Sequence, residues 1–148
     1  MKVVIQRVSQ ASVTVNDSVV GKIGSGLVIF LGIKRGDNEA DALYLVQKTV
    51  HLRIFCDSAG KFNLSALDTH AGILVVSQFT LLADTRKGHR PSFTDAASAI
   101  EARRLYEHFL SLLKKTGLQA EHGQFQEKML VEVLNNGPVT IILDSKDH

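Results

Sequence analysis

The chain has only two prolines, although about 5 % of an average protein is proline, so that roughly seven would be expected in 148 residues. Pro138 lies in the polar segment 135–140, between two apolar runs that read as strands. Proline fixes φ and has no N–H, so at this position it would interrupt an ordinary strand ladder. We therefore expect the backbone around Pro138 to have a specific task.

Two further polar segments stand beside apolar runs. Pro91 closes a basic stretch with three permanent cations, a titratable histidine and a glycine that lets the backbone approach a ligand, namely Arg86, Lys87, Gly88, His89 and Arg90. The other segment follows the most hydrophobic strand pattern in the middle of the chain and brings hydroxyl and amide groups to its end. It consists of Ser77, Gln78, Phe79 and Thr80. With the backbone around Pro138, these segments indicate a site for a charged, phosphate-bearing ligand.

The composition is that of one domain spanning residues 1–148, with 45 % hydrophobic and 22 % charged residues. A chain of this length buries roughly two thirds of its unfolded surface. Its single cysteine, Cys56, excludes an internal disulfide framework and favours a reducing cytoplasm. We expect Cys56 to be a small buried residue beside Phe55, with a reactive thiol as the alternative. No apolar run approaches about 18 residues, so neither a signal peptide nor a membrane span is expected.

The net charge is only +2, far from the overall basicity of a protein that lives on nucleic acid. Any contact with RNA must therefore be local, and the basic stretch 86–90 is the place for it. A charge run alone is more often a solvated surface turn. Its position directly after a polar strand end favours the binding role here.

Short strands dominate the predicted secondary structure. Apolar residues that alternate or run together predict hairpins of an antiparallel sheet over residues 2–8, 12–15, 18–24 and 26–33. Further strands are expected over residues 52–56 and 72–78. Near the end of the chain, one strand carries Met129, Val131 and Val133 on a single face, and the next carries Val139, Ile141 and Leu143.

Two segments have helical spacing instead. The first begins after Asp37 or Asn38 as its N-cap and buries a face formed by Leu43, Val46 and Val50. The second begins at Ser98, whose spacing to Glu101 is that of a capping box, and ends at Gly117. Its buried face comprises Ala102, Leu105, Phe109 and Leu112. Strands outnumber helices and do not alternate with them in a βαβ rhythm, which predicts an α+β fold with a largely antiparallel sheet or barrel and two main helices.

Several familiar catalytic motifs are missing from the sequence. It has no Gly-x-Ser-x-Gly elbow and no Gly-Lys-Ser/Thr phosphate loop, and Ile29 stands where a dinucleotide loop from Gly24 needs its third glycine. The histidines and the cysteine lack zinc-ligand spacing, so we expect neither a metal nor a cofactor. Asp84 and Asp95 could pair as catalytic carboxylates, but a chain with 15 acidic residues shows such pairs by chance.

Four segments taken together resemble the D-aminoacyl-tRNA deacylase family. They are Gln6-Arg7-Val8, Ser77-Gln78-Phe79-Thr80, Arg90-Pro91-Ser92-Phe93 and Asn136-Gly137-Pro138-Val139-Thr140. The Ser-Gln-Phe-Thr segment alone is a weak signal, but it is specific when Gly-Pro follows near the end of so short a chain. The likeness keeps its order from Met1 to about Leu143. Residues 144–148 match nothing in the pattern and are expected to form a loose tail.

The resemblance implies a cytoplasmic homodimer that hydrolyses the ester between a D-amino acid and the terminal ribose of tRNA, with no membrane partner. Glycine, which is achiral, would be a further substrate, including glycine mischarged on tRNA for alanine. The catalytic floor of the pocket would be Ser77, Gln78, Phe79 and Thr80, and tRNA would bind to Arg86, Lys87, His89 and Arg90. Substrate binding and the choice of chirality would fall to Gly137, Pro138, Asn136, Met129 and Arg7.

In this family the Gly-Pro peptide is cis and enters the active site of the partner subunit. Carried over to Gly137 and Pro138, a cis bond would turn both carbonyls to one side. There they could accept a hydrogen bond from the substrate's α-ammonium and leave no room for an L side chain. Selection would then depend on backbone atoms, whichever amino acid is attached.

Two mechanisms remain open for Thr80. As a nucleophile, its hydroxyl needs a neighbouring base, and the motif contains neither histidine nor lysine. Alternatively, backbone N–H groups near Phe79 and Thr80 stabilise the oxyanion while the vicinal ribose hydroxyl of the substrate helps a water molecule to attack. The second mechanism is the one that we favour.

Three other functions also remain open. A related deacylase with a trans Gly-Pro peptide and relaxed chirality shares most of the pattern. A non-catalytic tRNA-binding module would use the stretch 86–90 but would leave Ser77 to Thr80 unexplained. A small-molecule esterase would account for the polar strand end but not for the cations.

Overall fold

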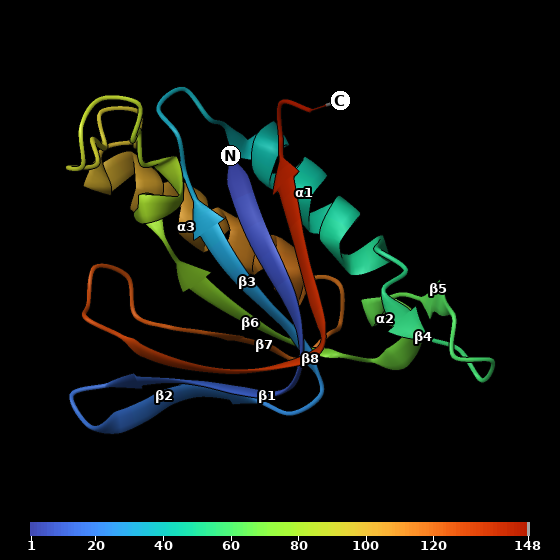
Figure 1. The fold of residues 1–148 in the computed structure, drawn as a ribbon. Helices are drawn as coiled ribbons and strands as arrows, with labels where there is room; N and C mark the ends of the chain where they lie inside the picture. Colours follow the sequence, from blue (N-terminus) through green and yellow to red (C-terminus); the bar gives the residue numbers. More distant parts are fainter. Residues whose placement is uncertain (148) are drawn as a thin grey trace.

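The computed structural model describes residues 1–147 and shows a curled main sheet with helices packed on one face (Figure 1). The central strand is β1 (Lys2–Val15), which pairs antiparallel with β2 (Ser18–Ile23), β3 (Gly26–Gly32) and β8 (Leu130–Asp144). From β3 the sheet continues through β6 (Gly72–Ser77) to β7 (Ala120–His122). The predicted strands 2–8 and 12–15 are therefore one long strand, and the two C-terminal strands are likewise one bent strand that begins after Met129.

The prediction of an α+β fold is confirmed, but the sheet is mixed and nearly closed. The pairs β3–β6 and β6–β7 are parallel. A parallel pair needs a long crossover connection, and α1 (Glu39–His51) and α3 (Ala99–Lys114) lie in these two crossovers. The prediction that strands and helices do not alternate in a βαβ rhythm is therefore wrong. The sequence conceals this rhythm because the connections 33–71 and 78–119 contain long segments besides α1 and α3.

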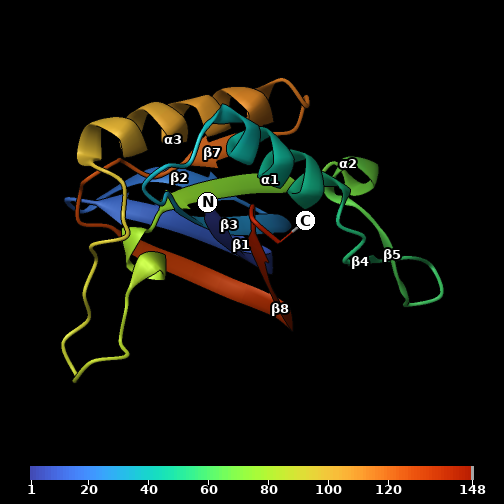
Figure 2. The same cartoon turned by 90° about the horizontal axis from the view of Figure 1, so that it is seen from above.

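Helices α1 and α3 lie side by side across the same face of the sheet (Figure 2). Asn38 caps α1 and Ser98 caps α3, as predicted. The buried positions differ in part, since Leu43 is 47 % exposed and Leu112 is only partly buried. α3 ends at Lys114, three residues before Gly117, which has a left-handed φ of +82°. The short helix α2 (Ala66–Thr69) was not predicted.

Apolar side chains fill both faces of the sheet. The larger cluster packs α1 and α3 onto β1, β3 and β6, with Ile5, Leu45 and Phe109 fully buried. The second cluster lies on the other face, where the C-terminal half of β1, β2 and the first part of β8 curl over, and includes Val13, Val28, Leu74 and Val76. The last residues of β3 and β6 lie between these two clusters and remain paired up to Leu31 and Ser77.

The predicted strand 52–56 shrinks to β4 (Phe55–Cys56), which pairs with β5 (Phe62–Leu64) in a separate two-stranded sheet. Because this hairpin stands apart from the main sheet (Figure 1), Cys56 is exposed and not buried as expected. The thiol lies 3.8 Å from Nη1 of Arg7.

The loose tail predicted for residues 144–148 is wrong for its first three residues. Asp144 still belongs to β8, and the buried Ser145 donates its N–H to the carbonyl of Met1 at 2.8 Å. Lys146 pairs with the buried Asp41 of α1 at 2.6 Å. His148, the last residue of the predicted tail, lies outside the described residues.

Candidate active site

The polar segment 77–80 lies where β6 leaves the sheet. Ser77 is opposite Leu31 in the parallel pair, and the N–H of Gln78 donates to the carbonyl of Leu31 at 2.8 Å as the last bond of that pair. The chain then turns into the 3₁₀ helix η1 (Phe79–Leu82). The buried strand β6 thus ends in polar side chains at a point where its backbone is still hydrogen-bonded to β3.

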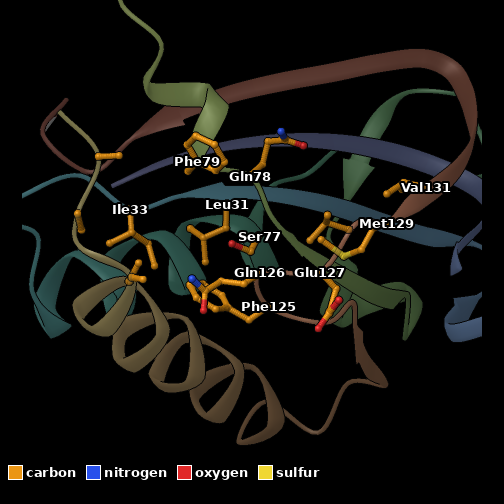
Figure 3. A pocket seen from close by; sticks show the side chains of 15 residues that line it. Leu31, Ile33, Ser77, Gln78, Phe79, Phe125, Gln126, Glu127, Met129 and Val131 are labelled. Carbon is orange, nitrogen blue, oxygen red and sulfur yellow. The ribbon is translucent and has the colours of Figure 1, made fainter. Parts of the chain in front are cut away.

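A cavity of about 520 Å³ opens beside this strand end (Figure 3). Ser77, Gln78 and Phe79 line it together with Leu31, and Met129 and Val131 lie at its far side. The start of α3 and the segment 125–127 close it opposite Phe79 (Figure 3). Four residues assigned to the site by resemblance, Ser77, Gln78, Phe79 and Met129, are therefore brought together in one cavity.

Phe79 and Thr80 are both exposed at this end of the molecule. The Phe79 ring is 57 % exposed and meets Phe93 edge to face, with centroids 5.0 Å apart. The hydroxyl of Thr80 accepts a hydrogen bond from the side-chain amide of Gln78. Thr80 itself is not among the residues that line the cavity.

The backbone donors at the start of η1 have no partner within the described residues. A helix of this kind leaves its first N–H groups unbonded, and here neither the N–H of Phe79 nor that of Thr80 has an acceptor among residues 1–147. These two donors stand at the cavity end of β6. They are available to an oxygen atom of a ligand.

The cavity has little acid–base chemistry of its own. Among residues 1–147, Glu127 is the only titratable residue that lines it. Within residues 1–147, no group of three or more histidine, cysteine, aspartate or glutamate side chains could hold a metal ion. In the same part of the chain, none of the helices has the length and apolar character needed to cross a membrane.

The Gly137–Pro138 turn lies elsewhere in the chain, at the bend of β8. Its peptide bond is cis, and both residues are exposed. Nε of Arg7 donates to the carbonyl of Asn136 at 2.8 Å, and Nη1 of the same side chain donates to the carbonyl of Ile54 at 2.7 Å. A Cβ atom on Gly137, whose φ is +150°, would meet the backbone nitrogen of Val139 at 2.8 Å. Only glycine fits here without displacing the turn.

The register of the sheet separates this turn from the cavity. Thr140, Gln6, Val28 and Leu74 form one row across β8, β1, β3 and β6. Ser77 is three residues farther along β6, and Pro138 lies on the opposite side of that row. Three strand spacings of about 4.8 Å across the sheet and five residues of about 3.3 Å along it put the two sites on the order of 20 Å apart. The Gly137–Pro138 turn therefore does not reach the cavity of its own chain.

The basic stretch forms an exposed loop beyond η1 (Figure 2). Asp84 and Ser92 close its base with two backbone hydrogen bonds of 2.8 and 2.9 Å. Arg86 already pairs with Asp84 through Nε and Nη2, and its hydrogen bonds hold the pKa of that carboxyl well below its usual range. Within residues 1–147, Lys87 and Arg90 form no ion pair.

Several residues that line the cavity could not be selected from the sequence. Phe125, Gln126 and Glu127 belong to an irregular connection, in which Gln126 has a φ of +66°. The alanines that line the opposite wall precede or open α3, namely Ala96, Ala97, Ala99 and Ala102. A run of small residues next to a helix start was the only available signal, and it does not identify a cavity by itself.

Known proteins match this chain over almost its whole length. The family model described as D-Tyr-tRNA(Tyr) deacylase matches residues 4–144. A D-aminoacyl-tRNA deacylase of Dehalococcoides mccartyi is 58 % identical over 148 residues, which cover 100 % of this chain and 97 % of that protein. A solved structure titled c-Myc DNA Unwinding Element Binding Protein has a TM-score of 0.92 and 40 % identity, and covers 97 % of this chain and 98 % of its own. A second solved structure, of a probable eukaryotic D-amino acid tRNA deacylase, has a TM-score of 0.85, 18 % identity and the same coverage, and shares the fold.

Proposed function

This chain belongs to the D-Tyr-tRNA(Tyr) deacylase family, and on that premise we propose that its 520 Å³ cavity receives the aminoacyl end of a D-aminoacyl-tRNA. It is a hydrolase of the ester bond between the amino acid and tRNA. The observation that supports this use of the cavity is the joint lining by Ser77, Gln78, Phe79 and Met129. An enzyme with this substrate works where translation takes place, so we assign it to the cytoplasm.

The proposed chemistry uses backbone donors. The unbonded N–H groups of Phe79 and Thr80 would hold the oxyanion that forms when water attacks the ester carbonyl. One well-placed donor of this kind is worth roughly 10²–10³ in rate. The vicinal ribose hydroxyl of the substrate would assist the attacking water.

Thr80 would be a poor nucleophile in this arrangement. Its hydroxyl accepts a hydrogen bond from Gln78, and no basic side chain donates to it or accepts from it among the described residues. A threonine nucleophile requires a base to take its proton. We therefore assign no proton transfer to the Thr80 hydroxyl, which bonds only to Gln78 among the described residues.

Selection for D-amino acids would come from a second copy of the chain. The Gly137–Pro138 turn does not reach its own cavity, and it is exposed, so it is free to enter the cavity of a partner. There its carbonyls would accept the α-ammonium of the substrate and exclude an L side chain. Glycine, without a side chain, would pass, so glycyl-tRNA, including glycine mischarged on tRNA for alanine, would also be hydrolysed.

The outer face of β8 supports a homodimer. Leu130, Leu134 and Ile142 point outward along it and are 67 %, 55 % and 67 % exposed. Apolar side chains repeated on one face of an edge strand are unusual on the surface of a monomer and mark a contact with another protein surface. The same strand carries the Gly137–Pro138 turn, so a partner that covers this face would bring the turn with it.

The basic loop would contact the tRNA beyond its aminoacyl end. It begins directly after η1, which lines the cavity through Phe79, and it returns at Ala96, which lines the opposite wall. Lys87, His89 and Arg90 are exposed and available to phosphates, whereas Arg86 is held by Asp84. We therefore assign most of the loop's attraction for RNA to Lys87 and Arg90.

The proposed function is tested with matched D- and L-aminoacyl esters of the same tRNA. Release of the D-amino acid alone, with the L-ester left intact, is the expected result. Release from both enantiomers would favour the related deacylase with relaxed chirality. Binding of both without release would favour a tRNA-binding module, and hydrolysis of simple esters without tRNA would favour a small-molecule esterase.

A further inference from the structure

A second cavity of about 590 Å³ adjoins the first one along α3. One of its walls is the side of α3 that carries Arg103, Tyr106 and Leu110, and the other is the segment 122–127. Phe125 and Glu127 line both cavities, so the two meet at these residues. Figure 3 shows Phe125 between the first cavity and α3. We call this second cavity the α3 groove.

The α3 groove extends from Arg103, next to the first cavity, to Lys114 at the end of the helix. Eleven residues of helix span about 16 Å. The groove is therefore an elongated channel that leads away from the proposed site of the ester. A linear ligand whose end occupies the first cavity has room to continue into it.

The residues at the junction suit the stacking of a base. The guanidinium of Arg103 lies over the Phe125 ring, 4.8 Å from its centroid, and Nη2 donates to Oε1 of Gln126 at 3.3 Å. Single-stranded RNA is bound by stacking its bases on aromatic rings and on guanidinium planes. The Phe125 ring is itself covered by Arg103 and packs against Tyr106, with ring centroids 5.5 Å apart, whereas Arg103 is exposed. The guanidinium plane of Arg103, supported by Phe125, is therefore the stacking surface at the point where the two cavities meet.

The charges along the α3 groove are mixed. Lys114 is exposed at the far end, and among residues 1–147 neither Arg103 nor Lys114 pairs with a carboxylate. Nδ1 of His122 is engaged with the carbonyl of Gly123 at 2.7 Å. Glu107 and Glu127 also line the groove. Carboxylates repel phosphates but accept hydrogen bonds from base amino groups such as that of cytosine, so this lining favours an unpaired strand with accessible bases over a duplex.

We propose that the α3 groove holds the single-stranded nucleotides that directly precede the terminal adenosine of the substrate tRNA. The guanidinium of Arg103, supported by Phe125, stacks on a base, and Lys114 neutralises a phosphate. This inference rests on the proposed function, because the ester on the terminal ribose places the end of the RNA strand in the first cavity. The basic loop then serves a different part of the tRNA.

The chain offers two neighbouring residues as matched controls. Arg104 follows Arg103 but pairs with Glu39 of α1, and Lys115 follows Lys114 but lies outside the groove. We compare Arg103→Ala with Arg104→Ala, and Lys114→Glu with Lys115→Glu. For each variant, kcat/KM is measured on D-aminoacyl-tRNA and on the D-aminoacyl ester of adenosine, which lacks the rest of the strand.

We expect each groove variant to lower kcat/KM on D-aminoacyl-tRNA roughly tenfold, the effect of losing one charge-assisted contact. On the adenosine ester, all four variants should stay within about twofold of the unchanged enzyme. The salt dependence of binding to deacylated tRNA should become shallower by about 0.7 for Lys114→Glu, as for one phosphate of a single strand. Lys115→Glu should keep the original slope.

Equal losses in the Lys114 and Lys115 variants, or no loss in either groove variant, would overturn the proposal. A fall in activity of Arg103→Ala on both substrates alike would show that Arg103 supports the cavity wall through Phe125 and would remove its stacking role. If the unchanged enzyme hydrolyses neither substrate, the proposed function fails. The tRNA binding of the four variants then still decides whether the groove holds RNA.

Discussion

The guanidinium Nε of Arg7 donates to the carbonyl oxygen of Asn136 at 2.8 Å, directly before Gly137. The same side chain binds the carbonyl of Ile54 and lies 5.2 Å from the centre of the Phe62 ring. Arg7 thus ties the turn at the bend of β8 to the hairpin formed by β4 and β5. A side chain on the central strand sets the position of a loop that is otherwise exposed.

Replacing Arg7 by alanine or lysine should loosen this turn. Neither residue can donate to the carbonyls of Asn136 and Ile54 in the same geometry. We expect kcat/KM on D-aminoacyl-tRNA to fall tenfold or more, since a hydrogen bond from a charged group contributes about 1.5–3 kcal/mol. Discrimination against the L-ester, measured in the same assay, should fall as well.

Arg53→Ala is the matched control for Arg7. Arg53 is also an arginine that binds a backbone carbonyl, that of Asn63 at 2.8 Å, and within residues 1–147 no hydrogen bond or ion pair joins it to β8. Its loss should leave the deacylation rate within about twofold of the original, because no group of the turn loses a partner. Equal effects of the two variants would refute the role of Arg7.

The basic loop should contribute unequally to tRNA binding. Lys87→Ala and Arg90→Ala should each reduce the slope of log affinity against log salt concentration by about one unit, for every tRNA alike. Arg86→Ala should change it less, because Asp84 already neutralises that guanidinium. A slope unaltered by Lys87→Ala and Arg90→Ala would show that the loop is a solvated surface turn.

The pair Asp41–Lys146 should stabilise the fold in a pH-dependent way. Burial alone would raise the pKa of Asp41, but hydrogen bonds from Lys146, Ser145 and the Asn38 N–H lower it to about 2. A carboxyl with a depressed pKa adds stability above its unfolded pKa of about 4 and loses it as the pH falls through its folded pKa. The free energy of unfolding should thus drop between about pH 4 and pH 2.

Lys146→Met should remove part of this contribution. We expect a lower free energy of unfolding at pH 7, measured by denaturant titration, and a flatter acid limb. Lys34→Met is the control, because Lys34 and Asp95 form an exposed pair at 3.7 Å, and such pairs contribute about 0–1 kcal/mol. Identical losses in the two variants would contradict the assignment.

The sequence predicted the parts of the fold that depend on local pattern. Ser98 caps α3 as its spacing to Glu101 indicated, and Asn38, one of the two candidates for the first helix, caps α1, because a cap is set by a few neighbouring residues. The parallel pairing of β3 with β6 was missed, since it depends on a crossover that alternation along a strand does not report. The packing of Ser145 and Lys146 was missed for the same reason, because their partners are distant in the sequence.

The residues of the candidate site likewise fall into those that the sequence identified and those that it did not. Ser77, Gln78 and Phe79 could be selected from the sequence because polar groups end a strongly apolar strand. Phe125 and Glu127 could not, because they lie in an irregular connection and reach the cavity only through tertiary packing. Arg86 was predicted to contact tRNA, but it pairs with Asp84 instead. This pairing depends on how the loop closes, which the sequence does not show.

The central claim is that backbone donors at Phe79 and Thr80, and not the Thr80 hydroxyl, carry the reaction. Single-turnover deacylation of D-aminoacyl-tRNA by Thr80→Ala and Thr80→Val tests it most directly, because neither change removes a backbone N–H. We predict that both variants keep substantial activity, and that replacing the vicinal ribose hydroxyl of the substrate with hydrogen is more damaging. Loss of turnover in both variants, with an acyl-enzyme trapped on the unchanged protein, would contradict it.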